Sequence, residues 1–135
     1  MHSFSLSNFL GGLLVAQQRQ KITFKYKNYN KLILYNVRFL LNLGYINGYT
    51  LETDENNIRY IIIYLKYFQN KPLISTMKIY TSPSRFKYIK LKKLKKLVIQ
   101  DFGSTYVLST SIGIVDGFTC LQKSIGGLLL YKLNF

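Results

Sequence analysis

The spacing of apolar residues predicts two helices in the first part of the chain. The first is expected between Ser5 and Gln20, with Ser7 as a candidate cap. Its apolar stripe consists of Leu6, Phe9, Leu10, Leu13 and Leu14. The second helix starts after Asn30, a suitable cap, and stops at Gly44, which fits a left-handed end. Its apolar positions are Ile33, Val37, Leu40 and Leu41.

Patterns typical of strands surround the second helix. Residues 22–27 (ITFKYK) alternate apolar and polar side chains. Residues 45–51 and 59–67 are two further β-rich runs, and the polar turn at residues 54–57 between them predicts an antiparallel hairpin. The order helix, strand, helix, strand, strand therefore predicts a small α/β unit with its helices on one face of a sheet.

The pattern changes near residues 70–76, where Asn70-Lys71-Pro72 interrupts it. Short strands are predicted after that point in ISTMKIY, FKYIKL, STYVLST and LLLYKLNF, and residues 116–123 fit one short helix. We therefore predict an α+β protein of two small domains. An N-terminal α/β domain spans residues 1–72, and a C-terminal mainly β domain with one short helix spans residues 73–135.

The charge of the chain points to a polyanionic partner. The 135 residues include 19 Lys and Arg against 5 Asp and Glu, a formal net charge of +14. A folded protein with that excess repels itself unless a polyanion supplies the opposite charge. Nucleic acid is the first expectation and an anionic membrane surface the second.

Residues for catalysis or metal binding are scarce. His2 is the only histidine and Cys120 the only cysteine, so the chain forms no internal disulfide and no cysteine-based zinc site. No acid–base or nucleophilic constellation stands out, and the DFG at residues 101–103 lacks the other kinase motifs. We expect a protein that is not an enzyme, with no metal, no cofactor and no small-molecule substrate. No apolar run approaches the ~20 residues that span a bilayer, so membrane insertion is not expected either.

A lysine-rich run, KYIKLKKLKKLV, follows in the second half. It places Leu91, Leu94 and Leu97 or Val98 at helical spacing among lysines 90, 92, 93, 95 and 96. Such a basic amphipathic segment can bind RNA phosphates, lie on a membrane, or form a solvated surface. Two further features stand out, the hydroxyl triplet Ser109-Thr110-Ser111 and the pair Gly126-Gly127, which indicates a turn or bulge before the last strand.

Three stretches carry a resemblance to a known family. LKYFQNKPLISTMKIYTSPSRFKY (residues 65–88) resembles the central segment of bacterial small-subunit ribosomal protein S8, the universal uS8 family. STSIGIV with the downstream SIGGLLLYKL is similar to the C-terminal signature of that family, and NKLILYNVRFLLNLGYI matches its helix and strand pattern. The family has an α/β N-terminal domain and a mainly β C-terminal domain, and it binds small-subunit rRNA.

The resemblance and the charge pattern together give a set of candidate RNA-binding residues. Lysines neutralise phosphates, short hydroxyls reach the sugar 2′-OH, phosphates and base edges, and a tyrosine ring offers a flat face to an exposed base. Gly113 would allow close approach of the RNA to the backbone. The candidates are Lys31, Ser82, Pro83, Ser84, Arg85, Lys87, Tyr88, Lys92, Lys93, Ser109, Thr110, Ser111, Gly113, Gly126 and Gly127.

The chain also departs from the family pattern. GGLLVA (residues 11–16) stands where the family has an arginine-bearing LTRIRN, Ile112 replaces a usual lysine, and Leu128 replaces the glutamate after Gly-Gly. Gly103 lies one place off the family's glycine, and the lysine run stands in a region that is often acidic. These departures resemble those of a diverged organellar protein. We hypothesise that the new lysines of this chain compensate for the missing arginines by binding other phosphates.

The resemblance implies a structural constituent of the small ribosomal subunit that binds central-domain rRNA and supports platform assembly and translation. Its partners would be small-subunit rRNA and neighbouring small-subunit ribosomal proteins. The abundance of residues with A/T-rich codons indicates an AT-rich genome, such as that of an organelle, although a nuclear genome can share this bias. The expected location is the mitochondrion, with the plastid as the alternative. Two other functions stay open, a basic peripheral membrane protein and an extraribosomal RNA-binding regulator with the same fold.

Overall fold

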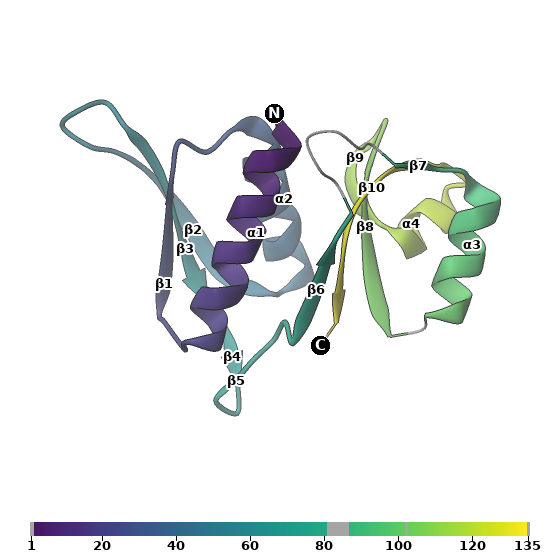
Figure 1. Cartoon of the computed structure of the whole chain (residues 1–135), viewed down its shortest axis with the longest axis horizontal. Helices are drawn as coiled ribbons and strands as arrows, with labels where there is room; N and C mark the ends of the chain where they lie inside the picture. The colour runs from purple at the N-terminus through teal and green to yellow at the C-terminus, as the bar shows by residue number, and fades with distance from the viewer. Residues whose placement is uncertain (1, 81–86, 102, 135) are drawn as a thin grey trace. The chain divides into compact units, whose positions relative to one another are not determined.

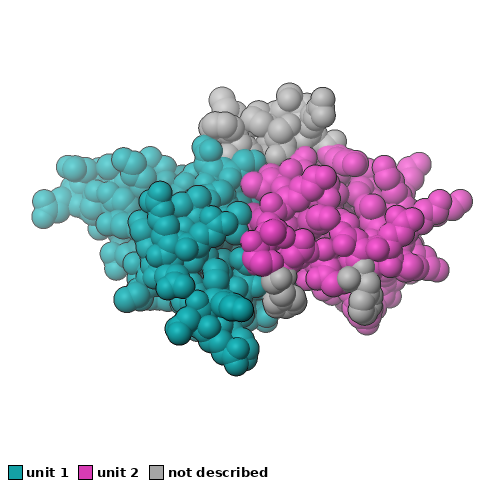
Figure 2. Space-filling view, turned by 60° about the horizontal axis from the view of Figure 1, so that its bottom comes forward, with its two compact units in different colours: residues 1–74 teal, residues 75–135 magenta. Residues whose placement is uncertain are grey.

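A computed structural model describes residues 2–80, 87–101 and 103–134 (Figure 1). Its elements are helices and antiparallel strands. The chain divides into two units, Met1–Ile74 (unit 1) and Ser75–Phe135 (unit 2), which Figure 2 colours separately. Both units combine helices with antiparallel strands, so the predicted α+β class is confirmed.

Unit 1 has the predicted element order. Its elements are α1 (His2–Gln18), β1 (Thr23–Lys27), α2 (Lys31–Leu43), β2 (Ile46–Thr53) and β3 (Arg59–Leu65), followed by a short hairpin of β4 (Tyr67–Phe68) and β5 (Lys71–Pro72). The three longer strands form an antiparallel sheet in the order β1-β3-β2. Figure 1 shows α1 and α2 on the same side of this sheet.

One face of the unit 1 sheet packs against the helices. The ring of Phe9 in α1 lies 5.8 Å from that of Phe24 and 5.3 Å from that of Tyr26, both in β1. On the central strand, Ile61 and Ile63 are fully buried. Since side chains alternate along a strand, the residues between these positions point to the opposite face.

The ends of α2 follow the predicted signals. The side chain of Asn30 accepts a hydrogen bond from the N–H of Ile33 at 2.9 Å, and Gly44 adopts the left-handed conformation with φ of 85°. In α1 the prediction differs from the structure, because the helix begins at His2. Ser7 therefore lies inside the helix and is not its cap.

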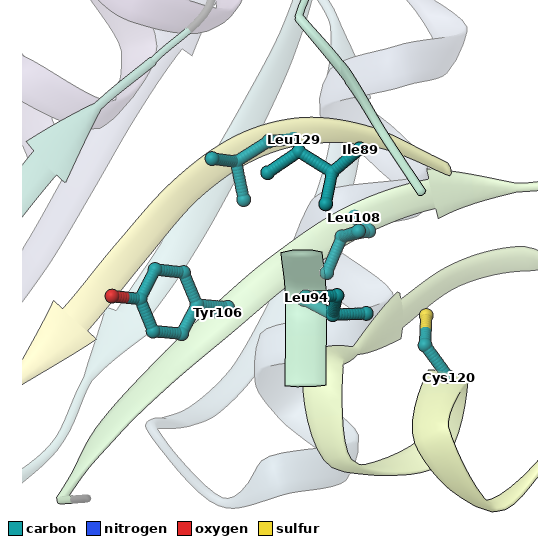
Figure 3. Packing of buried hydrophobic residues seen from close by; sticks show 6 residues of the cluster. All are labelled: Ile89, Leu94, Tyr106, Leu108, Cys120 and Leu129. Atoms are coloured by element: carbon teal, nitrogen blue, oxygen red, sulfur yellow. The ribbon is translucent and has the colours of Figure 1, made fainter. Parts of the chain in front are cut away.

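Unit 2 is a curved sheet covered on one face by two helices. Its elements are β6 (Thr76–Ile79), β7 (Tyr88–Ile89), α3 (Leu91–Gln100), β8 (Ser104–Thr110), β9 (Gly113–Asp116), α4 (Gly117–Gln122) and β10 (Gly127–Asn134). The strand order is β6-β10-β8-β9, and β7 also pairs with β10. Sheet and helices both contribute to the buried core cluster that Figure 3 labels: Ile89, Leu94, Tyr106, Leu108, Cys120 and Leu129.

Two predictions for unit 2 were wrong in detail. The described part of unit 2 has two helices where one was expected, since the lysine run folds as α3. Of the predicted strand FKYIKL, Tyr88–Ile89 form β7, and Phe86 lies outside the described residues. Apolar and polar residues alternate up to Leu91, and from there the apolar residues are three or four positions apart. A strand pattern is therefore followed directly by a helix pattern. The predicted short helix is present as α4, capped by Asp116, whose carboxylate accepts from the N–H of Thr119 at 3.2 Å.

Candidate nucleic-acid interface

The hydroxyl triplet forms the end of β8 and its turn into β9. Thr110 pairs with Gly113 across the turn. Its hydroxyl accepts a hydrogen bond from the N–H of Ile112 at 3.2 Å and donates one to the carbonyl of Gly113 at 2.9 Å. Gly113 has φ of +115°, a conformation that favours glycine. The Thr110 hydroxyl and Gly113 thus both shape the turn itself.

The three hydroxyls do not point the same way. Ser109 and Thr110 are consecutive in a strand, so their side chains lie on opposite faces of the sheet. Ser111 is exposed at the tip of the turn. Of the triplet, Ser109 is therefore the hydroxyl on the side of the sheet away from the helices, and Ser111 is the one that a ligand at the end of the sheet would meet.

Ser109 lies in a row with Tyr88 across three strands. Leu128 of β10 pairs with Ser109 of β8 on one side and with Tyr88 of β7 on the other. Directly paired residues point to the same face. Because their neighbours Leu108 and Ile89 belong to the buried core, this row (Tyr88, Leu128 and Ser109) faces away from α3 and α4. Tyr88 is 64% exposed, so its ring is free to meet a flat ligand.

The two glycines hold β10 close to its neighbours. A Cβ atom on Gly126 would lie 2.6 Å from the carbonyl oxygen of Ile89 and 3.3 Å from the hydroxyl of Tyr88. A Cβ atom on Gly127 would lie 2.6 Å from the carbonyl oxygen of Ser109. Contacts this short do not occur for real Cβ atoms, so both positions require glycine for packing within unit 2.

Helix α3, on the other side of the sheet from this row, presents a lysine-rich surface. Leu94 is fully buried, whereas the lysines of the helix are exposed: Lys92, Lys93, Lys95 and Lys96. Lys87 and Lys90, which flank β7, are exposed as well. The helix starts without a side-chain cap, so its first N–H groups add to the attraction of the lysines for an anion.

The apolar side of α3 is used inside the protein. Leu97 and Val98 pack against the same core cluster as Leu94. This leaves the lysines for solvent or a ligand and removes the apolar face that a membrane-bound amphipathic helix would insert. In the part of the chain that the structure describes, no helix is long and apolar enough to cross a membrane. Nor does any group of three or more His, Cys, Asp or Glu residues gather there as metal ligands.

The comparison with protein families shows which family this basic chain belongs to. Residues 5–133 match the family model described as Ribosomal protein S8. The chain belongs to the ribosomal protein S8 family. The match spans both units and includes α3, the row and the two glycines.

Curated relatives have the same family name. The chain is 33% identical over 129 residues to "Small ribosomal subunit protein uS8m" of Acanthamoeba castellanii, covering 96% of this chain and 98% of the relative. It is 30% identical over 103 residues to "Small ribosomal subunit protein uS8" of Ehrlichia chaffeensis, covering 76% of both chains. To the protein of that name from Desulfovibrio desulfuricans it is 38% identical over 90 residues, covering 67% of this chain and 66% of the relative.

The remaining candidate residues of this S8 family chain fall outside the row. Lys31 is exposed as the first residue of α2, in unit 1. Ser82, Pro83, Ser84 and Arg85 lie outside the residues that the structure describes. The structure thus brings together Tyr88, Ser109, Thr110, Gly126 and Gly127, and the lysines of α3 follow β7 directly along the chain.

Sequence reasoning missed a further cationic site beside β7. The ammonium groups of Lys78 and Lys87 lie 5.3 Å and 5.9 Å from the ring centroid of Tyr80. The alternation in ISTMKIY, which puts Lys78 and Tyr80 two residues apart, would have placed both on one side of a strand. Cation–π contacts of this kind hold lysines in position at the surface of the sheet.

A carboxylate at the end of α3 was also missed. Asp101 accepts hydrogen bonds from the Lys132 ammonium at 2.8 Å, the Tyr106 hydroxyl at 2.9 Å and the Ser104 hydroxyl at 3.1 Å. These bonds, with the Lys132 bond foremost, lower the pKa of Asp101. Burial together with the bond to Asp101 raises the pKa of Tyr106. The cluster links the end of α3 to β8 and β10.

Proposed function

We propose that this chain is a structural protein of the small subunit of the mitochondrial ribosome. It binds small-subunit rRNA of the central domain, supports assembly of the platform, and contacts neighbouring small-subunit proteins. Membership of the S8 family over residues 5–133 supports this role. The function is one of binding and assembly, with no catalytic step and no cofactor.

The observation that carries the proposal is the row of Tyr88, Leu128 and Ser109 on the face of the unit 2 sheet that points away from α3 and α4. A distorted RNA helix offers 2′-hydroxyls, phosphates and unstacked bases. The ring of Tyr88 suits a base, and the Ser109 hydroxyl suits a sugar or a base edge. The exposed Lys87, which precedes Tyr88, and the exposed Lys92 and Lys93 of α3 suit phosphates.

The other candidates act at the edges of this interface or support it. Ser111 is exposed at the turn and can meet a phosphate or a 2′-OH. Thr110, Gly113, Gly126 and Gly127 hold the backbone in the shape that the RNA meets. Lys31 in unit 1 and Ser82, Pro83, Ser84 and Arg85 complete the proposed contacts.

A mitochondrial location is supported by the relative from Acanthamoeba castellanii, whose name has the mitochondrial suffix and which this chain matches over nearly its whole length. The surplus of residues with A/T-rich codons agrees with that location. The plastid alternative has no such support. Burial of the apolar side of α3 counts against a peripheral membrane protein.

The proposal is tested by quantitative mass spectrometry across a sucrose gradient of mitochondrial lysate. We expect one copy of this chain per small subunit, retained at high salt together with small-subunit rRNA. Recovery with free RNA and outside the subunit peak would indicate an extraribosomal regulator. Recovery with membranes, confirmed by flotation with anionic liposomes, would indicate the membrane-bound alternative. Either result would contradict the proposal.

A further inference from the structure

The unit 1 sheet has a second face, opposite the helices, whose chemistry is unexplained so far. Because Ile61 and Ile63 point toward the helices, Tyr60, Ile62 and Tyr64 point the other way. In β1 the residues paired with these three are Lys27, Lys25 and Thr23, all exposed. We call these six residues the open sheet face.

One ring on this face has free space beside it. Tyr64 pairs with Thr23 on one side and with Gly48 on the other. Nothing lies within 4 Å of the position that a Cβ atom on Gly48 would occupy. Tyr64 is 39% exposed, although it lies on the central strand of the sheet. With small neighbours on both sides, its ring is accessible to a flat ligand from above the sheet.

Two exposed lysines of β1 favour an anion on this face. Lys25 lies in the row next to Tyr64, at a diagonal spacing of about 7 Å, and Lys27 lies one row further. Lys25 rests over the ring of Tyr60, with its ammonium 4.1 Å from the ring centroid. The carboxylate of the face, Glu52, pairs with Tyr60 and therefore lies two rows away from Tyr64.

The nearest loop carboxylate is already engaged. Asp54 accepts hydrogen bonds from the N–H of Ile58 at 2.9 Å and from the hydroxyl of Tyr60 at 3.0 Å. The bond from Ile58 is the main cause of the lowered pKa of Asp54. The acidic groups thus lie at the Tyr60 end of the face, and the Tyr64 end has the small residues Thr23 and Gly48 beside an accessible ring.

We propose that the open sheet face binds a single-stranded RNA segment, with an unpaired base stacked on Tyr64 and the adjoining phosphates held by Lys25 and Lys27. Exposed aromatic side chains on a sheet with flanking cations are how proteins hold unpaired bases. A peptide partner would need a sheet edge or an apolar groove, whereas this face offers a flat ring on a central strand. The proposal goes beyond the rRNA interface proposed above, which lies mainly in unit 2.

Ultraviolet cross-linking in purified small subunits tests the contact directly. Trypsin cleaves after Arg59 and Lys66, so the peptide from Tyr60 to Lys66 is released with Tyr64 inside it. We expect mass spectrometry to find this peptide with a nucleotide attached to Tyr64. Detection of this peptide in its unmodified form alone, in samples where other peptides of the same subunits carry nucleotides, would overturn the proposal.

An affinity measurement with a twelve-residue oligouridylate tests the stacking separately. The full chain carries Tyr88→Ala as background, so that stacking in unit 2 does not mask the effect. Tyr64→Ala should weaken binding roughly fivefold to a hundredfold, the usual contribution of one stacked base. Tyr64→Phe keeps the ring and should bind as the background does. Equal affinity of the Ala and Phe variants, both with unchanged thermal unfolding, would overturn the proposal.

The two proposals fail in distinguishable ways. Ser109→Ala should weaken binding of a structured rRNA fragment and leave oligouridylate affinity unchanged, whereas Tyr64→Ala should affect the oligouridylate. Absence of the first effect alone would contradict the unit 2 interface, and absence of the second alone would contradict the open sheet face.

Discussion

A Cβ atom on Gly127 would lie 2.6 Å from the carbonyl oxygen of Ser109, so the backbones of β10 and β8 approach each other closely at these two residues. The partner atom belongs to the backbone of β8, which cannot rotate away as a side chain would. The signature glycine and the signature serine are therefore connected by packing inside unit 2. The spacing of β8 and β10 at this point also fixes where the Ser109 side chain lies.

We predict that Gly127→Ala destabilises the protein by about 1–3 kcal/mol, the usual cost of overpacking a close contact. The measurement is the midpoint of urea unfolding. Gly48→Ala is the matched control, because Gly48 is also in a strand and a Cβ atom there meets nothing within 4 Å. It should unfold at the same or a higher urea concentration. An unchanged midpoint for Gly127→Ala would show that β8 and β10 can move apart freely.

We predict that the Ser109 hydroxyl contributes to RNA binding and the Thr110 hydroxyl to stability. Thr110→Val removes the hydrogen bonds to Ile112 and Gly113, and we expect the unfolding free energy to fall by about 1 kcal/mol. Ser109→Ala should leave stability unchanged and weaken binding of an rRNA fragment by about two- to tenfold, the contribution of one hydrogen bond. The opposite assignment of the two effects would contradict the geometry of the turn.

The lysines of α3 should determine the salt dependence of RNA binding. Replacing Lys92, Lys93, Lys95 and Lys96 with glutamine should lower the slope of log affinity against log salt by about 0.7–0.9 for each phosphate that the helix no longer neutralises. The matched control changes the same net charge elsewhere, with glutamine at Lys21, Lys66, Lys71 and Lys123. If rRNA affinity is undiminished, or if both quadruple variants behave alike, α3 has no specific role in holding phosphates.

The Asp101 cluster should give the protein a stability component that disappears in acid. The pKa of Asp101 is lowered in the folded state, so its bond to Lys132 stabilises the protein above the ordinary carboxyl pKa of ~3.9. That stabilisation is lost as the pH falls from there through the lower folded pKa. Asp101→Asn should lower the melting temperature at pH 6, and the difference from the natural chain should close below about pH 4.

A second substitution tests whether Lys132 is the group responsible. Lys132→Gln should lower the melting temperature at pH 6 on its own, and should add little when Asp101→Asn is already present, because the two residues share one interaction. Fully additive effects would mean that the ion pair contributes nothing and that each residue acts through other contacts.

Local signals in the sequence were sufficient for much of unit 1. Helix α2 begins after Asn30 and ends before Gly44, as predicted, because a cap and a left-handed glycine act within one turn of chain. The alternation in ITFKYK gave β1 to within one residue. In unit 2 the helical spacing of Leu91, Leu94 and Leu97 was visible in the sequence and α3 confirms it, but the overlapping strand pattern of FKYIKL left this helix out of the predicted fold.

The sequence by itself determined the element types of unit 1, the basic character, the family resemblance and the residues of the signature. Those features depend on composition and on spacing along the chain, which are visible before folding. Only the tertiary structure decided that Tyr88 and Ser109 share one face while Thr110 does not, because strand pairing sets which residues lie side by side. It also decided that the ring of Tyr64 is accessible beside Gly48, since the register of three strands places a small residue on each side of that ring.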